Sequence, residues 1–119
     1  MTASANVTVT RSFTFDAAHV LPWHPGKCSR LHGHTYRLEV SVTGPLDSNG
    51  VVIDFGDIKK TVAAAVLDPL DHTLLNNTID NPTAERLALH ILGELQTAGL
   101  TPSLVRLWET ADCSAEVRP

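Results

Sequence analysis

The chain has 119 residues, of which 43% are hydrophobic and 18% are charged, and its formal net charge is −4. This length suits one compact domain, residues 1–119, and the composition excludes a largely disordered chain. The nine Lys and Arg residues are scattered and form no basic stripe, so nucleic acid is not an expected partner. No apolar run approaches the roughly 20 residues that span a membrane, and the first six residues lack the pattern of a signal peptide. We therefore expect a cytoplasmic protein.

The first half of the chain predicts two strands separated by a loop. Polar and apolar residues alternate over 7–16 and again over 34–43, which is typical of half-buried strands. The segment 21–33 between them contains two prolines and two glycines, which interrupt regular structure. Turn-forming residues at 47–50 precede the short apolar run 51–53, and this arrangement favours a hairpin.

Two helices are predicted after these strands. Asp54 or Asp57 can cap the first, in which apolar residues recur at three- and four-residue steps until Pro69. The second begins at Asn81-Pro82-Thr83, which offers a cap and a first-turn proline, and it closes at Gly99. Both helices are amphipathic, so each is expected to lie on a sheet.

The end of the chain predicts two more strands, in short alternating segments at 105–107 and 114–118. The order strand, strand, helix, helix, strand, strand predicts an α+β fold, with an antiparallel four-stranded sheet covered by two helices on one face. The other face and the sheet edges then need polar residues or a partner. This requirement favours a homo-oligomer.

Three histidines form a candidate metal site. His32-Gly33-His34 lies where the loop enters the second strand, and residues two apart on a strand point to the same side. His19 comes just past the first strand, which can pair beside the second. Three neutral imidazoles with no obvious fourth protein ligand are typical of zinc that keeps a position open for water or substrate. We predict Zn²⁺ at His19, His32 and His34, although such a histidine turn can also be merely a polar loop.

Three residues outside this set can move protons. Cys28 lies in the irregular loop beside Lys27 and Arg30, where positive charge favours the thiolate that acts as a base. Its alternative role is that of a small half-buried apolar residue, and both Cys28 and Cys113 are expected to be free thiols. Asp71 and His72 pair a carboxylate with an imidazole, although the two can equally form a polar turn at the end of a helix.

Glu109 is a candidate for binding a ligand. It shares a strand face with Val105 and Leu107, where an unpaired carboxylate would be costly. Its two acceptor oxygens suit an amino group next to a ring N–H, as in a guanine-like or pterin ring, and an arginine is the alternative partner. His24 has no assigned role, and His90 belongs to the polar face of the second predicted helix.

Six motifs spread over nearly the whole chain resemble those of one enzyme family. They are Phe13-x-Phe15-Asp-Ala-Ala-His19, Cys28-Ser-Arg-Leu-His32-Gly-His34, Asp54-Phe55 with Lys59, Leu70-Asp71-His72, Asn81-Pro82-Thr83-Ala84-Glu85 and Glu109-Thr110. The family is that of pyruvoyl-tetrahydropterin synthase and bacterial 6-carboxy-tetrahydropterin synthase, the latter an enzyme of queuosine biosynthesis. The resemblance implies the tunnelling fold, or T-fold, whose subunits form barrels, commonly as hexamers with active sites at subunit interfaces.

The resemblance also assigns a role to each candidate residue. It implies zinc on the three histidines, Cys28 as the proton-abstracting residue, Asp71 and His72 as a proton-transfer pair, and Glu109 as the anchor of a pterin ring. The implied substrate is 7,8-dihydroneopterin triphosphate. In one branch of the family the products are 6-carboxytetrahydropterin, acetaldehyde and triphosphate, whereas the pyruvoyl branch keeps all the carbons.

The spacing between Cys28 and His32, with three intervening residues, resembles the bacterial carboxy branch. We therefore expect a zinc-dependent lyase of that branch. One alternative is the pyruvoyl enzyme or a related dihydropterin lyase that uses the same residues. An alternative of another class is a non-catalytic, zinc-stabilised module that binds a pterin or a protein.

Overall fold

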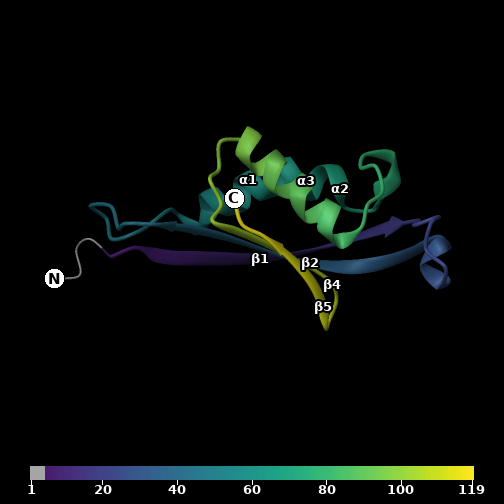
Figure 1. Cartoon of the computed structure of the whole chain (residues 1–119). Helices are drawn as coiled ribbons and strands as arrows, with labels where there is room; N and C mark the ends of the chain where they lie inside the picture. The colour runs from purple at the N-terminus through teal and green to yellow at the C-terminus, as the bar shows by residue number, and fades with distance from the viewer. Residues whose placement is uncertain (1–4) are drawn as a thin grey trace.

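The computed structural model describes residues 5–119, in which helices cover one face of a sheet (Figure 1). The start of the chain, where no signal peptide is expected, lies mostly outside these residues. Within them, no helix combines the length and the apolar character needed to cross a membrane. The elements in chain order are β1 (Val7–His19), a 3-10 turn (Lys27–Ser29), β2 (His32–Gly44), α1 (Phe55–Val62), a π-helical turn (Ala63–Leu67), α2 (Asp68–Leu70), β3 (Thr73–Leu74), a second 3-10 turn (Leu75–Asn77), α3 (Ala84–Thr97), β4 (Leu104–Thr110) and β5 (Cys113–Val117).

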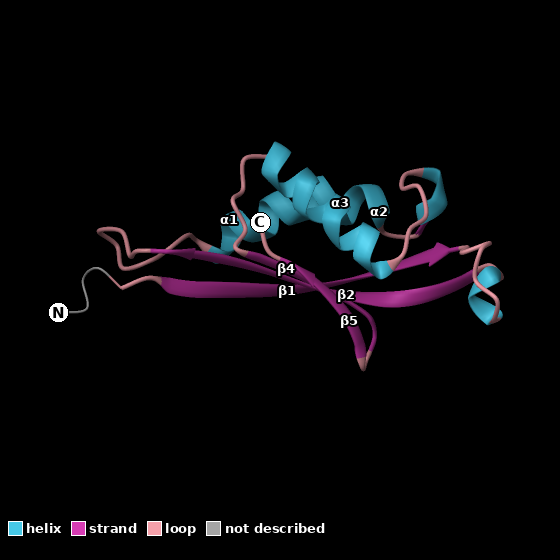
Figure 2. Cartoon of the chain, in the orientation of Figure 1, coloured by secondary structure: helices cyan, strands magenta, loops and turns pink. Residues whose placement is uncertain are grey.

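The sheet has the strand order β3-β1-β2-β4-β5. Figure 2 shows the helices gathered on one side of the long β1 and β2 strands. The antiparallel β1–β2 pair extends from Val7 opposite Gly44 to His19 opposite His32, and β4 and β5 continue the antiparallel pattern. The predicted α+β fold and its four antiparallel strands are confirmed. Two residues of β3 add a parallel pairing with Ala17 and Ala18, which the sequence did not predict.

The register of these strands decides which side chains form the core. Because residues directly opposite one another point to the same face, Phe15 and Tyr36 face the helices together and stack with ring centroids 5.2 Å apart. Their neighbours on the outer face are polar, as in the hydroxyl pair of Thr10 and Ser41. The strands meet α1 and α3 through a core that includes Leu38, Val40, Ile58, Val62, Leu87, Ile91, Leu95, Val105 and Leu107.

The first predicted helix is interrupted by a π-helical turn. Asp54 caps α1 by accepting a hydrogen bond from the Gly56 N–H, as predicted. The helix then widens at Ala63–Leu67 and continues through α2, so Pro69 lies inside its last turn. Proline lacks an N–H and cannot bond the carbonyl four residues earlier, and the π-helical turn lies directly before it.

Two local predictions are wrong. The apolar run 51–53 forms no strand, although the expected turn before it is present and Asp47 accepts hydrogen bonds from the N–H groups of Asn49 and Gly50. The residue that caps α3 is Thr83, whose Oγ1 accepts from the Arg86 N–H, so Pro82 precedes the cap and is not in the first turn. The helix itself lies where the sequence predicted it.

Candidate active site

The end of the β1–β2 pair brings three histidines together. His19 is the last residue of β1 and pairs with His32, the first residue of β2, while His34 follows two residues later on the same face. The ring centroid of His19 lies 4.6 Å from that of His32 and 5.2 Å from that of His34. The alternating pattern predicted a first strand that ends at residue 16, whereas β1 extends to His19. Because β1 extends this far, the His19 imidazole lies beside the other two.

Backbone carbonyls set the orientation of two of these rings. The Nδ1 of His19 lies 2.8 Å from the Pro82 carbonyl oxygen, and the Nδ1 of His32 lies 2.7 Å from that of Arg30. A carbonyl oxygen only accepts hydrogen bonds, so each Nδ1 must carry the proton and donate it. In the neutral imidazole the Nε2 atom is then left with a free lone pair, which is the form that binds metals.

The three free nitrogens fit a cation. The Nε2 atoms of His19 and His32 are 3.0 Å apart, and two lone pairs cannot hydrogen-bond to each other. The Nε2 of His34 is buried and has no hydrogen-bond partner among residues 5–119. The three histidines offer ligand atoms within 4.8 Å of one another. Two nitrogens on one tetrahedral zinc ion lie about 3.3 Å apart, so this geometry matches a metal centre.

The surroundings favour the neutral, metal-binding form of His34. Burial lowers the pKa of His34 from its ordinary value, and the neighbouring His19 and His32 lower it further, while Glu109 opposes them. Metal ligation requires a deprotonated imidazole, so a lowered pKa reduces competition from protons. The fully buried Tyr36 lies beneath the same rings, and burial also raises the pKa of its hydroxyl.

Glu109 faces the three histidines from β4. Its Oε1 lies 3.6 Å from the Nε2 of His19 and 3.7 Å from that of His34, and its side chain is 27% exposed. The pairing of β4 with β5 shifts register between Trp108 and Thr110, which marks a β-bulge at this residue. Bulges re-aim side chains and are common beside active sites. The structure thus places the predicted carboxylate next to the three imidazoles, half open to solvent.

Cys28 lies outside the histidine cluster. It occupies the 3-10 turn in the loop between β1 and β2, it is half-buried, and its thiol is free, as predicted. Its carbonyl accepts a hydrogen bond from the Leu21 N–H, which ties the turn back to the end of β1. Cys113 is also a free thiol and is exposed on β5.

Asp71 and His72 do contact each other. Asp71 Oδ1 lies 3.0 Å from the Nδ1 of His72, and the same oxygen accepts the Asp16 N–H at 2.9 Å. The hydrogen bond from Asp16 is the main cause that lowers the pKa of Asp71, with His72 adding to it. His72 has a φ of 61° and donates its own N–H to the Asp16 carbonyl. The pair is therefore fastened to β1 with its imidazole exposed.

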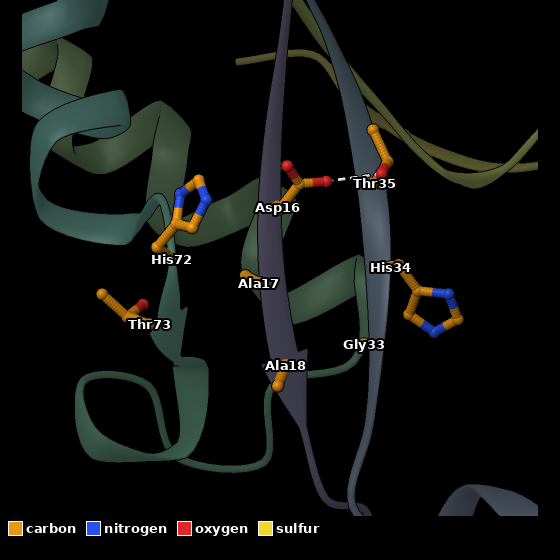
Figure 3. A pocket seen from close by; sticks show the side chains of 8 residues that line it. All are labelled: Asp16, Ala17, Ala18, Gly33, His34, Thr35, His72 and Thr73. Atoms are coloured by element: carbon orange, nitrogen blue, oxygen red, sulfur yellow. Dashed lines mark hydrogen bonds between the residues drawn. The ribbon is translucent and has the colours of Figure 1, made fainter.

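An open pocket of about 480 Å³ lies beside this pair (Figure 3). Figure 3 shows His72 on one side of β1, whereas the imidazole of His34 points away from it beyond β2. Asp16 and Thr35 lie between them and are joined by a hydrogen bond. The described chain thus brings Glu109 to the three histidines but leaves the Asp71–His72 pair and Cys28 at separate places.

The two remaining histidines play no part in this cluster. His24 accepts a hydrogen bond from the Gly26 N–H through its Nδ1 and therefore shapes the loop that carries Cys28. His90 lies on α3, which packs over the sheet through other residues. Its exclusion from the site stays a prediction.

Comparisons with known proteins identify the family. A model of 6-pyruvoyl tetrahydropterin synthase matches residues 8–119. The chain belongs to this family. It is 40% identical to the 6-carboxy-5,6,7,8-tetrahydropterin synthase of Haemophilus influenzae, over 86% of this chain and 92% of that one. It is 46% identical to the dihydroneopterin monophosphate aldolase of Pyrococcus furiosus, over 66% and 65% of the two chains.

A solved structure supports the family assignment. The 6-pyruvoyl tetrahydropterin synthase of Caenorhabditis elegans superposes with a TM-score of 0.88 and 26% identity, covering 100% of this chain and 99% of that chain. The predicted T-fold is therefore confirmed, as is the resemblance drawn from the six motifs.

Sequence reasoning missed the groups that hold the site residues in place. Asp16 was given no role of its own from the sequence, yet both its backbone N–H and its carbonyl bind the Asp71–His72 pair. The carbonyls of Arg30 and Pro82 orient two imidazoles, and no side-chain pattern reports a backbone acceptor. The sequence did single out Pro82 as part of the motif Asn81-Pro82-Thr83-Ala84-Glu85, directly before the helix cap.

Proposed function

We propose that this chain is a zinc-dependent 6-carboxy-5,6,7,8-tetrahydropterin synthase of queuosine biosynthesis. It would convert 7,8-dihydroneopterin triphosphate and one water molecule to 6-carboxytetrahydropterin, acetaldehyde and triphosphate. The observation that carries the proposal is the convergence of the three histidine Nε2 atoms beside the Glu109 carboxylate. The name of the Haemophilus influenzae relative and the short Cys28–His32 spacing support the carboxy branch.

His19, His32 and His34 would hold the zinc ion through their Nε2 atoms. A zinc ion held there would supply Lewis acidity, which would make a nearby substrate hydroxyl more acidic. Three imidazoles are the ligand set expected for a zinc ion that also binds water or substrate. The hydrogen bonds to the Pro82 and Arg30 carbonyls keep two of the rings oriented for this role.

Glu109 would anchor the pterin ring. Its carboxylate can accept hydrogen bonds from an exocyclic amino group and the adjacent ring N–H at once, as a bidentate pair. With Oε1 within 3.7 Å of two histidines, the ring would be held with its side chain beside the metal. The partial exposure of Glu109 leaves one side of the carboxylate open to the ligand.

Cys28 would take a proton from the substrate side chain, and Asp71 and His72 would serve as a proton-transfer pair. Asp71 suits that role because its lowered pKa keeps it anionic and able to orient His72 through the 3.0 Å contact. One copy of the chain leaves these groups at separate places. We therefore propose a homo-oligomer, a hexamer by family resemblance, in which neighbouring subunits complete each active site.

Product analysis tests this function. Purified zinc-loaded protein is incubated with 7,8-dihydroneopterin triphosphate, and the products are quantified by mass spectrometry. Equal amounts of 6-carboxytetrahydropterin and acetaldehyde are expected. His34→Ala should lose both zinc and turnover, whereas His90→Ala on the surface of α3 should retain both. A pyruvoyl product would move the protein to the other branch, and binding without turnover would support the non-catalytic alternative.

A related dihydropterin lyase is the second candidate. The observation that favours it is the 46% identity to the Pyrococcus furiosus dihydroneopterin monophosphate aldolase. The same assay with 7,8-dihydroneopterin monophosphate separates the two. Turnover of the monophosphate in preference to the triphosphate would assign the chain to the aldolase reaction and contradict the carboxy synthase.

A further inference from the structure

The turn Asn81-Pro82-Thr83 connects the start of α3 to the metal centre. The Thr83 N–H donates to the Asn81 carbonyl at 2.8 Å, and this bond closes a tight turn around Pro82. The Pro82 carbonyl oxygen takes no part in this hydrogen bond. It instead accepts the Nδ1 proton of His19 at 2.8 Å. Both Pro82 and His19 are buried, so water does not compete readily for this contact.

Asn81 determines the shape of this turn. Its φ of 49° lies in the left-handed region, which asparagine tolerates better than most residues because its side chain can form local hydrogen bonds. Its Oδ1 accepts the indole N–H of Trp23 at 2.6 Å. Trp23 belongs to the loop after β1, four residues beyond His19, so Asn81 ties the loop that follows the histidine to the same turn.

We propose that Asn81 is a positioning residue for the metal centre. It holds the Pro82 carbonyl against His19, so that Nδ1 carries the proton and Nε2 faces His32 and His34 as a free ligand. This inference rests on the metal site of the proposed function. It assigns to the motif a role that helix capping alone does not explain, because the cap is made by Thr83.

The structure separates this role from general stability. If Asn81 only shaped a surface turn, its replacement would change the stability of the fold and leave the imidazole tautomer as it is. If Asn81 positions His19, its replacement lets the Pro82 carbonyl withdraw, and the proton can then occupy either ring nitrogen. The Nε2–H tautomer cannot bind a metal through that atom. Metal affinity must then fall even in folded protein.

The test compares three variants with the wild type. Asn81→Ala loses the acceptor and disfavours a positive φ, Asn81→Asp keeps both properties, and Asn77→Ala is a control on the same segment. Zn²⁺ affinity is measured by competition with a chromophoric chelator. Removing an outer-shell partner typically costs 10–100-fold in metal affinity, and we expect Asn81→Ala to weaken Zn²⁺ binding by about this factor. Asn81→Asp and Asn77→Ala should stay within about threefold of the wild type.

A second measurement uses metal-free protein. Long-range ¹H–¹⁵N correlation NMR reports which nitrogen of His19 carries the proton. The Nδ1–H tautomer should dominate in the wild type and in Asn81→Asp, and both tautomers should appear in Asn81→Ala. Unchanged affinity together with an unchanged tautomer in Asn81→Ala would overturn the inference.

Two further outcomes are distinguishable. If the wild type itself binds no zinc, the metal site of the proposed function fails, while the tautomer comparison still decides the positioning role. If circular dichroism shows that Asn81→Ala does not fold, Trp23→Phe removes the hydrogen bond from the other side and leaves the turn residues intact. A Trp23→Phe protein with wild-type affinity and tautomer would then contradict the inference.

Discussion

At the scale of single residues, the chemistry of the site depends on which ring nitrogens already have a hydrogen-bond partner. The Nδ1 atoms of His19 and His32 are committed to backbone carbonyls, while the Nε2 atom of His34 is buried without a hydrogen-bond partner in the described part of the chain. An unpartnered polar atom inside a protein is costly. A metal ion bound there would remove that cost for all three nitrogens together, which is a physical reason for their convergence.

Replacing Cys28 separates proton transfer from metal binding. Cys28 lies outside the group of histidines, in a turn that the backbone hydrogen bond to Leu21 stabilises. We expect Cys28→Ala to abolish turnover, by a factor of at least about 100 as for loss of a general base, while zinc content stays at the wild-type level. Metal analysis and an activity assay on the same preparation check this. Loss of zinc from Cys28→Ala would show that the thiol is a ligand.

The lowered pKa of His34 predicts a pH dependence of the metal-free protein. A histidine whose pKa is lower in the folded state binds fewer protons there than in the unfolded chain, so acid favours unfolding. The stability that this group contributes to the fold is complete above the pKa of the unfolded state, about 6.5. It is lost as the pH falls through the lower pKa of the folded state. Urea unfolding of metal-free protein should show stability decreasing from pH 7.5 to pH 5. In His34→Gln the decrease should be smaller, and equal decreases would contradict this assignment.

At the scale of elements, the full pairing of β1 with β2 and the start of α3 position the centre. The pairing places His19 opposite His32, and a shift of one residue would send His34 and Tyr36 to the outer face. The bulge in β4 then turns Glu109 towards the same end of the sheet. The cap of α3 fixes the turn that meets His19. The three histidines and Glu109 therefore belong to strands that the core holds in place.

The Thr83 cap offers a test at this scale. Thr83→Ala removes the acceptor of the Arg86 N–H, and a lost N-cap typically costs about 1 kcal/mol of stability. Thr83→Ser should retain most of that contribution. Thr97→Ala, at the exposed end of the same helix, should change stability by less than about 0.5 kcal/mol. Chemical denaturation measures all three, and equal effects of Thr83→Ala and Thr97→Ala would contradict the capping role.

At the scale of the whole molecule, the sheet extends beyond the helices that cover it. Figure 1 shows the long β1–β2 pair projecting on both sides of the helix layer, and the molecule measures 55 × 24 × 21 Å. Its radius of gyration of 15.8 Å exceeds the roughly 13.5 Å expected for a compact domain of this length. β5 forms one edge of the sheet, and β3 meets β1 only at Ala17 and Ala18 within residues 5–119.

Such a shape predicts self-association. Sheet edges present unpaired backbone groups that can bind a second copy, and barrel closure is one way to remove such edges. Light scattering coupled to size exclusion should therefore give a mass that is an integer multiple, above one, of the 12.8 kDa chain. A 12.8 kDa species that is fully active at micromolar concentration would show that one copy suffices, and the proposal of shared active sites would be wrong.

The sequence by itself determined the element order, the core face of each long strand and the identity of the three clustered histidines. These features are periodic or local, because side chains alternate along a strand and His32 and His34 are two residues apart. The resemblance of six motifs determined the family, which the comparisons confirm.

Only the tertiary structure decided how the site residues are held. The contacts of Pro82 with His19, Asn81 with Trp23 and Asp16 with Asp71 join residues 55–63 positions apart in the chain. Backbone carbonyls and a positive φ at Asn81 leave no mark in the composition or periodicity of a sequence. The strand expected at 51–53 does not form, although Asp47 closes the turn before it through local hydrogen bonds. Local patterns therefore select the elements, and long-range contacts fix the protonation and direction of the groups that do the chemistry.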